Sequence, residues 1–419
     1  MGPVQFLSTS ARLAVRGGKA YWLWLSFLIA LIAWGGLAYV DQLRHGLIVT
    51  NMRDQVSWAF YIGNFTFLVG VAAAAVVLVI PAYIYHWKPI KEIALLGEIL
   101  AISAIVMCLL FVVADMGRPD RGWHLVPVVG HMNFPNSVLA WDVLVLNLYL
   151  VLNAVIVTHL LYRGLQGRSY NQRLVVPLVL FSIPAAVGIH TVTAFIYVGL
   201  PARPYWNASI LAPRFLVSAF CSGPAIMLIL FQILQRTTKI AIKDAAIWKV
   251  AELMAYAMFV NLFLLGAEIF KEYYSATEHL VHLQYLFAGV RGHHALVPYA
   301  WTFVGCGIAA FLLFLFSATR RNVVTLNLGC LLIYASVYIE KGMGLVIPAF
   351  TPDMLGEIYE YTPTIHELRI GAAIFSTGFL IFTVLCKIAV PIMTGEFAGT
   401  ADLGRPDELR STPSARGAA

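Results

Sequence analysis

The sequence predicts an all-α polytopic membrane protein, and three observations support this fold class. Of the 419 residues, 60% are hydrophobic and only 12% are charged, against about 25% charged residues in a typical soluble domain. The mean hydropathy is +0.80. Stretches of about twenty mostly apolar residues, each able to cross roughly 30 Å of hydrocarbon, recur along most of the chain. This composition excludes a cytosolic enzyme and a disordered scaffold. Because no basic stripe or nucleic-acid motif is present, we also expect no nucleic-acid partner.

Ten apolar stretches predict about ten transmembrane helices. The first runs from Tyr21 to Val40, is too long for a signal peptide, and ends in Asp41 without a small-residue cleavage site, so we expect it to be retained. In order along the chain the stretches lie at about 21–40, 57–85, 93–114, 138–162, 174–199, 215–235, 250–270, 297–318, 323–346 and 366–391.

The positive charges predict how these helices are oriented. With the N-terminus inside, 18 of the 28 Lys and Arg residues and 8 of the 21 acids fall on the cytoplasmic half. That half therefore carries +10 and the outer half −3, which together give the net charge of +7. We expect both termini in the cytoplasm and the protein embedded in the lipid bilayer of the inner (cytoplasmic) membrane.

The organisation of the chain follows from these helices. A cytoplasmic N-tail (1–20) precedes the first helix and its outer loop (21–56), and a polar cytoplasmic tail (392–419) follows the last helix (366–391). The longest connections all face outside, at about 115–137, 271–296 and 347–365. We therefore expect any chemistry to take place within the helices or at their outer face.

No redox centre is predicted within this chain. The five cysteines lie inside apolar stretches, without the Cys-x-x-Cys or Cys-x-x-Cys-His spacing of iron–sulfur or c-type haem sites. A b-type haem needs two facing histidines at one depth, whereas His159 and His190, the two well inside apolar stretches, lie toward opposite faces. No nucleotide-binding or zinc motif occurs either. We expect no haem, iron–sulfur cluster or other metal here.

The outer loop before the fourth span is the most informative segment. It and the start of that span carry Asp115, Arg118, Trp123, His124, His131, Trp141 and Asp142. An acid inside the membrane is costly, so Asp142, about one turn inside the span, is a functional candidate that Arg118 or a histidine could neutralise. One interpretation is a polar pocket, roofed by the tryptophans, that hydrogen-bonds and protonates a carbonyl-bearing ring. The other is structural: Asp115 and Arg118 pair at a helix end, and the helix dipole favours Asp142.

Other acids inside the apolar stretches have two interpretations as well. Glu98 and Glu252, nearer the cytoplasmic half, are candidates for a proton path toward the outer pocket. Glu252 fits equally well as an interfacial side chain near a helix end. Glu268, Glu340 and Glu367 are outer candidates, and for two of them we expect structural pairing at helix ends: Glu340 with Lys341 and Glu367 with Arg369.

Further polar candidates lie in the second and fifth spans. Tyr61 and Asn64 are about one turn apart, so they share a helix face that could hydrogen-bond a ligand. Trp58 fits an aromatic belt position at the membrane surface. His190 lies in the outer half of the fifth span.

A short internal sequence similarity favours a repeated architecture. The segment 121–127 before the fourth span resembles 291–298 before the eighth, allowing one inserted residue. Because four spans separate the two segments, both face outward, as parallel repeats of a four-helix unit require.

The chain resembles the NrfD/PsrC family of quinone-interacting membrane subunits. The resemblance rests on ten spans with the N-terminus inside and on motifs in a fixed order. These are Trp-x-x-Tyr-Ile-x-Asn-Phe at 58–65, Asp-x-Gly-Arg-Pro at 115–119, Trp-Asp at 141–142, and the segment around 190–214. It covers about residues 20–395. Within the family, the chain is most similar to integral membrane subunits of menaquinone reductase (Qrc) complexes.

The resemblance implies two four-helix bundles (57–199 and 215–346) flanked by the first and last helices. It also implies menaquinone as substrate near the outer face and a periplasmic iron–sulfur subunit docked on that face. Further molybdopterin-like and multihaem cytochrome c subunits are implied as partners. In the family the quinone pocket occupies the region of His131 and Asp142, with Arg118 and His124 close by.

We therefore expect a subunit of a membrane-bound menaquinone oxidoreductase, which passes electrons from an iron–sulfur partner to menaquinone. Expected proton donors to the quinone are Asp142 and His131; expected quinone contacts are Arg118, His124, Trp141, Tyr61, Asn64 and His190; and the expected proton path comprises Glu98, Asp115 and Glu252.

Two alternatives remain open. The protein could instead oxidise quinol for a sulfur-compound or nitrite reductase. A secondary transporter is the other class, for which Pro177, Pro184 and Pro224 permit kinks, but no Gly- or Pro-interrupted spans occur at matching repeat positions.

Overall fold

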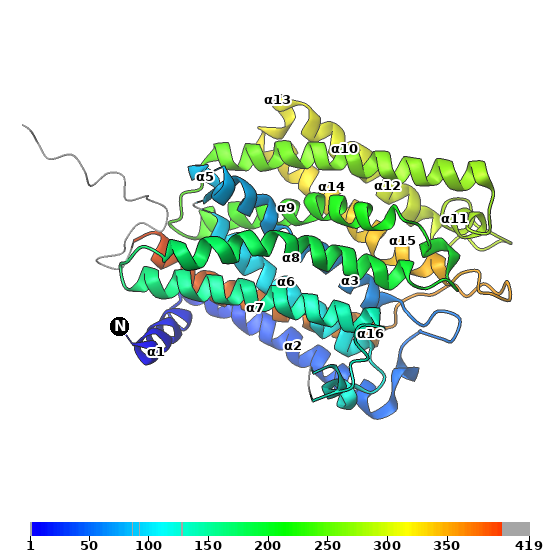
Figure 1. The fold of residues 1–419 in the computed structure, drawn as a ribbon, viewed down its shortest axis with the longest axis horizontal. Coiled ribbons are helices and arrows are strands. Elements are labelled where there is room, and N and C mark those ends of the chain that lie inside the picture. Colours follow the sequence, from blue (N-terminus) through cyan, green and yellow to red (C-terminus); the bar gives the residue numbers. More distant parts are fainter. Residues whose placement is uncertain (1, 86, 92, 127–128, 396–419) are drawn as a thin grey trace, which may run out of the picture.

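The computed structural model describes residues 2–85, 87–91, 93–126 and 129–395, which form helices joined by loops (Figure 1). Within this part of the chain, ten helices are long and apolar enough to cross a membrane, which confirms the predicted all-α polytopic fold. Most of the predicted tail at 392–419 lies outside the described residues.

The helices are bounded as follows: α1 (Pro3–Ala14), α2 (Lys19–His45), η1 (Leu47–Val49), α3 (Phe60–Ala72), α4 (Ala75–Val79), η2 (Ile80–Ile84), α5 (Lys88–Lys91), α6 (Ala94–Asp115), η3 (Pro119–Leu125), α7 (Val138–Leu165), α8 (Gln172–Val198), η4 (Pro204–Trp206), α9 (Leu211–Thr237), α10 (Asp244–Ser275), α11 (Leu280–Phe287), α12 (Val297–Leu315), α13 (Ser317–Arg320), α14 (Val323–Lys341), α15 (Met343–Val346), η5 (Ile347–Ala349) and α16 (Ile365–Met393).

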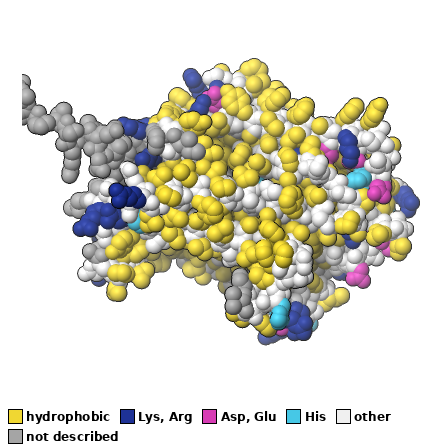
Figure 2. All heavy atoms as spheres, viewed as in Figure 1, with side chains coloured by type: hydrophobic (Ala, Val, Ile, Leu, Met, Phe, Trp, Pro, Cys, Tyr) yellow, Lys and Arg dark blue, Asp and Glu magenta, His cyan; other side chains and the backbone are white. Residues whose placement is uncertain are grey.

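The long helices run side by side between two ends of the molecule (Figure 1). We term the end at which α2 begins the N-terminal end. Figure 2 shows a wide hydrophobic surface between the ends, with Lys and Arg gathered at the N-terminal end and charges of both signs at the opposite end. This distribution of charge is the one expected of a protein that spans a bilayer.

Eight of the long helices pack as two groups of four, which meet where α3 and α8 contact α9. Helices α3, α6, α7 and α8 form one group, and α9, α10, α12 and α14 form the other. α3 contacts both α6 and α9, whereas α2 packs at the edge against α16. The most apolar part of the second span, Phe60–Tyr83, is 78% buried and that of α2 only 22%, so the span that begins with α3 is central and α2 flanks the bundle.

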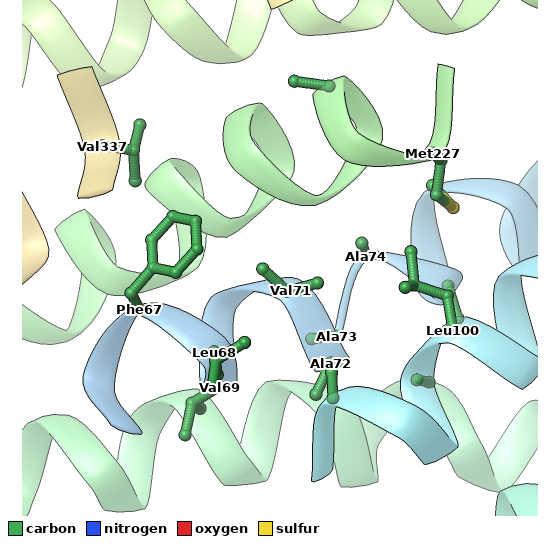
Figure 3. Close-up of a cluster of buried hydrophobic side chains, with 14 of the residues drawn as sticks. Phe67, Leu68, Val69, Val71, Ala72, Ala73, Ala74, Leu100, Met227 and Val337 are labelled. Carbon is green, nitrogen blue, oxygen red and sulfur yellow. The ribbon is translucent and has the colours of Figure 1, made fainter. Parts of the chain in front are cut away.

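Small residues allow α3 and α9 to approach closely where the two groups meet. Figure 3 shows Phe67 of α3 beside Val337 of α14, and Ala74, in the turn after α3, on the side of Met227 of α9. A Cβ atom added at Gly223 of α9 would contact the Cβ of Ala74 and lie 3.1 Å from its Cα. Close helix packing over small residues is a common means of association within membranes.

A Gly223→Leu substitution should therefore lower the apparent midpoint of thermal unfolding in detergent. The added side chain meets the backbone of the facing segment, and overpacking of this kind costs about 1–3 kcal/mol. Gly188→Leu is the matched control, because a Cβ at Gly188 of α8 meets no atom within 4 Å. Equal midpoints for the two variants would show that the α3–α9 contact does not depend on Gly223.

Two of the spans are interrupted. The second bends after α3 and continues as α4 and the π-helical turn η2, which contains Pro81, a residue that cannot donate a backbone hydrogen bond. The ninth ends its regular helix at Lys341 and continues as α15 and η5. The interrupted spans are the first span of the first four-helix group and the last span of the second group. They do not match as the paired broken helices of a transporter would.

The predicted N-tail is a helix. α1 packs against α16, and its Phe6 ring lies 5.4 Å from the Tyr162 ring at the end of α7. This helix of 12 residues is too short to span a membrane, so the segment remains a tail before the first span, and its place in the cytoplasm remains a prediction.

Candidate functional site

Asp142 is buried near the start of α7, where α7 faces α8. The residue is 2% exposed, and Thr193 Oγ1 of α8 donates a 2.6 Å hydrogen bond to its Oδ1. Ser137 caps α7 by accepting a hydrogen bond from the Ala140 N–H at 3.4 Å. Asp142 thus lies about one turn inside the helix, as the sequence predicts.

His190, Thr193 and Tyr197 share the buried face of α8 that meets Asp142. His190 Nδ1 lies 3.0 Å from the Ala186 carbonyl, so Nδ1 carries the hydrogen and Nε2 of the neutral ring is an acceptor. This Nε2 is buried and has no hydrogen-bond partner among the described residues. A buried acceptor without a partner is costly and marks a place where a ligand hydroxyl could bind. We term Asp142, His190, Thr193 and Tyr197 the α7–α8 cluster.

Asp115 extends this cluster toward α6. It is the last residue of α6, and its Oδ1 is buried without a hydrogen-bond partner in the described part of the chain. Asp115 and Asp142 both act electrostatically on the Tyr197 hydroxyl, which itself hydrogen-bonds Thr66 of α3. The Tyr197 hydroxyl therefore links α8 to α3 within electrostatic range of both acids.

Arg118 does not neutralise Asp142, contrary to the first interpretation of the outer loop, and does not pair with Asp115, contrary to the second. Its Nε and Nη2 donate to Asp120 at 3.0 and 2.9 Å, and this hydrogen-bonded ion pair lowers the pKa of Asp120 from its ordinary value. The reason is local. Asp120 lies two residues further along the same loop, so its carboxylate accepts the hydrogen bonds of the Arg118 guanidinium.

The loop histidines lie together on the surface. The rings of Trp123 and His124 stack at 3.8 Å, and the His131 ring lies 6.3 Å from that of His124. Trp141 is 41% exposed, and its indole N–H donates to the Pro135 carbonyl at 2.7 Å. The predicted pocket therefore divides into a buried α7–α8 cluster and a surface loop that carries Arg118, His124 and His131.

Tyr61 and Asn64 are engaged in contacts between helices. The Tyr61 hydroxyl donates to Gln42 Oε1 of α2 at 2.7 Å, and Asn64 Oδ1 accepts from the Tyr338 hydroxyl of α14 at 2.9 Å. Gln42 in turn donates to the Ala114 carbonyl of α6 at 2.7 Å. These bonds link α2 to α3 and α6, and α3 to α14. Sequence analysis missed Gln42, which lies two residues beyond the predicted first span (21–40) and gave no signal of its own.

A second buried cluster joins α9, α10 and α14. Arg214 of α9 forms ion pairs with Glu268 of α10 and with Glu340 of α14, the latter between Nη2 and Oε1 at 2.6 Å. Lys341 Nζ lies 3.3 Å from Glu340 Oε1, and Asn261 Nδ2 donates to Oε2 at 3.3 Å. We term these five residues the Arg214 cluster. The predicted Glu340–Lys341 pair is confirmed, but it is buried within a larger network that sequence analysis missed.

The Arg214 cluster borders a small cavity of about 20 Å³, which has room for about one water molecule. Arg214, Glu268 and Glu340 supply polar lining, together with Tyr205 from η4. Burial raises the pKa of the Tyr205 hydroxyl to about 12, and this hydroxyl donates to the Gly344 carbonyl at 3.4 Å. The four charged side chains of the Arg214 cluster, two basic and two acidic, have a net charge of zero.

The remaining predicted acids lie apart from both clusters. Glu98 is 2% exposed near the N-terminal end, and its Oε2 has no hydrogen-bond partner among the described residues. Glu252 lies at the surface, where it accepts hydrogen bonds from Lys249 and Tyr256, so the structure has the interfacial arrangement rather than a buried path. Glu367 completes a capping box with Thr364 at the start of α16 and does not pair with Arg369 as expected.

Within the described residues, no group of three or more His, Cys, Asp and Glu side chains is placed to hold a metal ion. The five cysteines are free thiols.

Comparison with known proteins adds a family assignment to this geometry. The family model described as "Polysulphide reductase, NrfD" matches residues 48–351. This range includes both clusters and the outer loop.

Three relatives are informative. A provisionally named dimethyl sulfoxide reductase membrane subunit of Halobacterium salinarum is 26% identical over 85% of this chain and 88% of its own length. The Hdr-like menaquinol oxidoreductase integral membrane subunit of Archaeoglobus fulgidus is 23% identical over 88% of this chain and 93% of its own length. The menaquinone reductase integral membrane subunit of Nitratidesulfovibrio vulgaris is 27% identical over 25% of each chain.

Proposed function

The chain belongs to the polysulphide reductase NrfD family, and on that premise we propose that it is the quinone-binding membrane subunit of a respiratory oxidoreductase complex. In this proposal it reduces menaquinone with electrons from a periplasmic iron–sulfur subunit docked on the end opposite the N-terminus. The N-terminal end then faces the cytoplasm of a bacterial or archaeal cell. Support comes from the menaquinone and menaquinol named in two relatives and from the excess of Lys and Arg at the N-terminal end.

The single observation that carries the proposal is the α7–α8 cluster. A quinone needs an apolar site for its ring and a few polar groups for its two oxygens. Asp142 and His190 supply an acid and an unpartnered imidazole nitrogen on facing helices within an otherwise hydrophobic bundle. Because Asp142 is only 2% exposed, side chains around it have to move before a ring can reach it.

Reduction of a quinone to a quinol takes up two electrons and two protons. We assign one proton to the Asp142 carboxyl, which the hydrogen bond from Thr193 holds toward α8. His190 Nε2 is an acceptor for a quinol hydroxyl, and Asp115 remains a proposed step of the proton path. His131 on the surface loop remains a proposed second donor. Glu98 remains a proposed step for protons from the cytoplasm, whereas Glu252 is left out because it lies at the surface.

The opposite direction is a second candidate. The relative named as a dimethyl sulfoxide reductase subunit favours a protein that oxidises quinol for a terminal reductase. The same side chains serve both directions, because a carboxylic acid that donates a proton to the quinone accepts one from the quinol when it is a carboxylate. The partner subunits then decide the direction. Molybdopterin-like and multihaem cytochrome c subunits are the partners that we propose beyond the iron–sulfur subunit.

Purification from native membranes in mild detergent tests the proposal. We expect the chain to co-purify with an iron–sulfur subunit and with extractable menaquinone. A co-purifying terminal reductase would assign the quinol-oxidising direction. A chain that purifies alone, without quinone, and conducts solute after reconstitution into vesicles would contradict the proposal and favour a transporter.

A further inference from the structure

A broad depression lies at the N-terminal end, where α7 ends and α8 begins. It has a volume of about 550 Å³, within the range of about 300–1,000 Å³ typical of small-molecule sites. Its lining consists of His159, Arg163, Tyr170, Asn171, Gln172 and Arg173. None of these residues takes part in either buried cluster, and the depression lies at the end opposite the α7–α8 cluster.

The lining is basic and rich in hydrogen-bond donors. It includes two arginines and no acid, and Lys91 adds a third positive charge, since its Nζ lies 5.5 Å from the centre of the Tyr170 ring. Arg163 Nε donates to the Ser169 carbonyl at 2.9 Å, which holds the guanidinium beside the loop. The planar guanidinium fork matches the geometry of a phosphate group.

His159 adds a donor of fixed tautomer. The Asn171 backbone N–H donates to His159 Nε2 at 3.3 Å, so in the neutral ring the hydrogen resides on Nδ1. Nδ1 is then a donor in the same depression as the two arginines. This combination suits an anion and disfavours a cation.

Apolar stripes lead from the depression along both helices. On α7, Val151 and Val155 precede His159 at intervals of four residues, and both are exposed, by 58% and 44%. On α8, Leu174 beside Arg173 and Phe181 are seven residues apart, so they share a helix face, and both are exposed, by 42% and 50%. α7 and α8 lie side by side (Figure 1), so the two stripes flank one path from the polar depression to the hydrophobic surface.

We propose that this depression binds the phosphate of an anionic phospholipid, with an acyl chain along the α7 and α8 stripes. The basic lining at the end of a bundle favours a negatively charged headgroup. The adjoining apolar stripes favour a lipid over a free phosphate ion, because a free ion has no apolar chain to pack against them. The proposal does not depend on the quinone chemistry.

Native mass spectrometry of the full chain in detergent tests this site. With phosphatidylglycerol as the added lipid, the Arg163→Gln/Arg173→Gln double variant should bind roughly 10- to 30-fold more weakly than the unchanged chain. The matched control is Arg12→Gln/Arg16→Gln, which removes the same charge from exposed positions at the same end. It should leave binding unchanged, and size-exclusion profiles establish that both variants are folded.

Three outcomes would overturn the proposal. An equal loss in both double variants would indicate general attraction to the basic end rather than a site. Phosphatidylcholine binding as tightly as phosphatidylglycerol would remove the role of the anionic headgroup. Inorganic phosphate that binds through Arg163 and Arg173 while phosphatidylglycerol does not would identify a free-phosphate site.

Discussion

Replacement of Asp142 by Asn should lower quinone turnover by at least about 100-fold while the complex still assembles. General acid–base groups typically contribute 10²- to 10⁴-fold to rate, and an amide cannot donate the carboxyl proton. The amide oxygen of the Asp142→Asn variant can still accept the Thr193 hydrogen bond, so the α7–α8 contact is preserved. The measurement is the rate of menaquinone analogue reduction by the purified complex with a reduced donor.

Two comparisons make this result specific. Asp120→Asn removes an acid from the exposed outer loop and should leave turnover nearly unchanged. In the Asp142→Asn complex, the iron–sulfur partner should still be reduced by the donor, because only the last step is affected. Normal quinone turnover in this variant would remove Asp142 from the mechanism, and a complex that fails to assemble would assign Asp142 a structural role.

Replacement of Arg214 by Met should be the most destabilising substitution in the second four-helix group. It leaves Glu268 and Glu340 buried without their shared partner, and removing one partner of a buried ion pair typically costs about 3–5 kcal/mol. We expect a large drop in the apparent midpoint of thermal unfolding in detergent. Arg236→Met, an exposed change on the same helix, is the control and should have little effect.

A second substitution should reverse part of that loss. The Arg214→Met/Glu268→Gln double variant removes one charge of each sign, so Glu340 keeps a balanced partner in Lys341 at 3.3 Å. Its unfolding midpoint should lie above that of Arg214→Met alone. If the double variant is no more stable than the single one, the loss comes from packing around Arg214 and not from an unpaired charge.

The α7–α8 cluster was only partly predictable. Asp142 was identifiable because an acid within a membrane span is energetically costly, so its presence there indicates a functional role. Its partner Thr193 gave no such signal, since a hydroxyl in a membrane helix can bond to its own backbone. The two interpretations of the sequence paired Arg118 with Asp142 or with Asp115, yet its guanidinium binds Asp120 two residues away. Proximity within the loop decided its partner.

The Arg214 cluster was harder to foresee. Its members stood in the sequence as separate acids and bases near different helix ends, and Glu340 already had an adjacent Lys341. Arg214 and Glu340 are 126 residues apart, so no spacing rule connects them. Their meeting depends on how α9 and α14 are rotated and how deeply each is placed.

The sequence by itself determined the ten helices, the class of the protein and the candidate acid Asp142. The free energy of transferring a helix into lipid is close to a sum of the contributions of its residues. This sum can be evaluated from one stretch of about twenty adjacent residues. Only the tertiary structure decided that Asp142 meets Thr193, that Arg214 lies between two glutamates, and that the loop histidines stay on the surface. These contacts depend on the relative rotation and depth of helices distant in the chain, which local hydropathy does not specify.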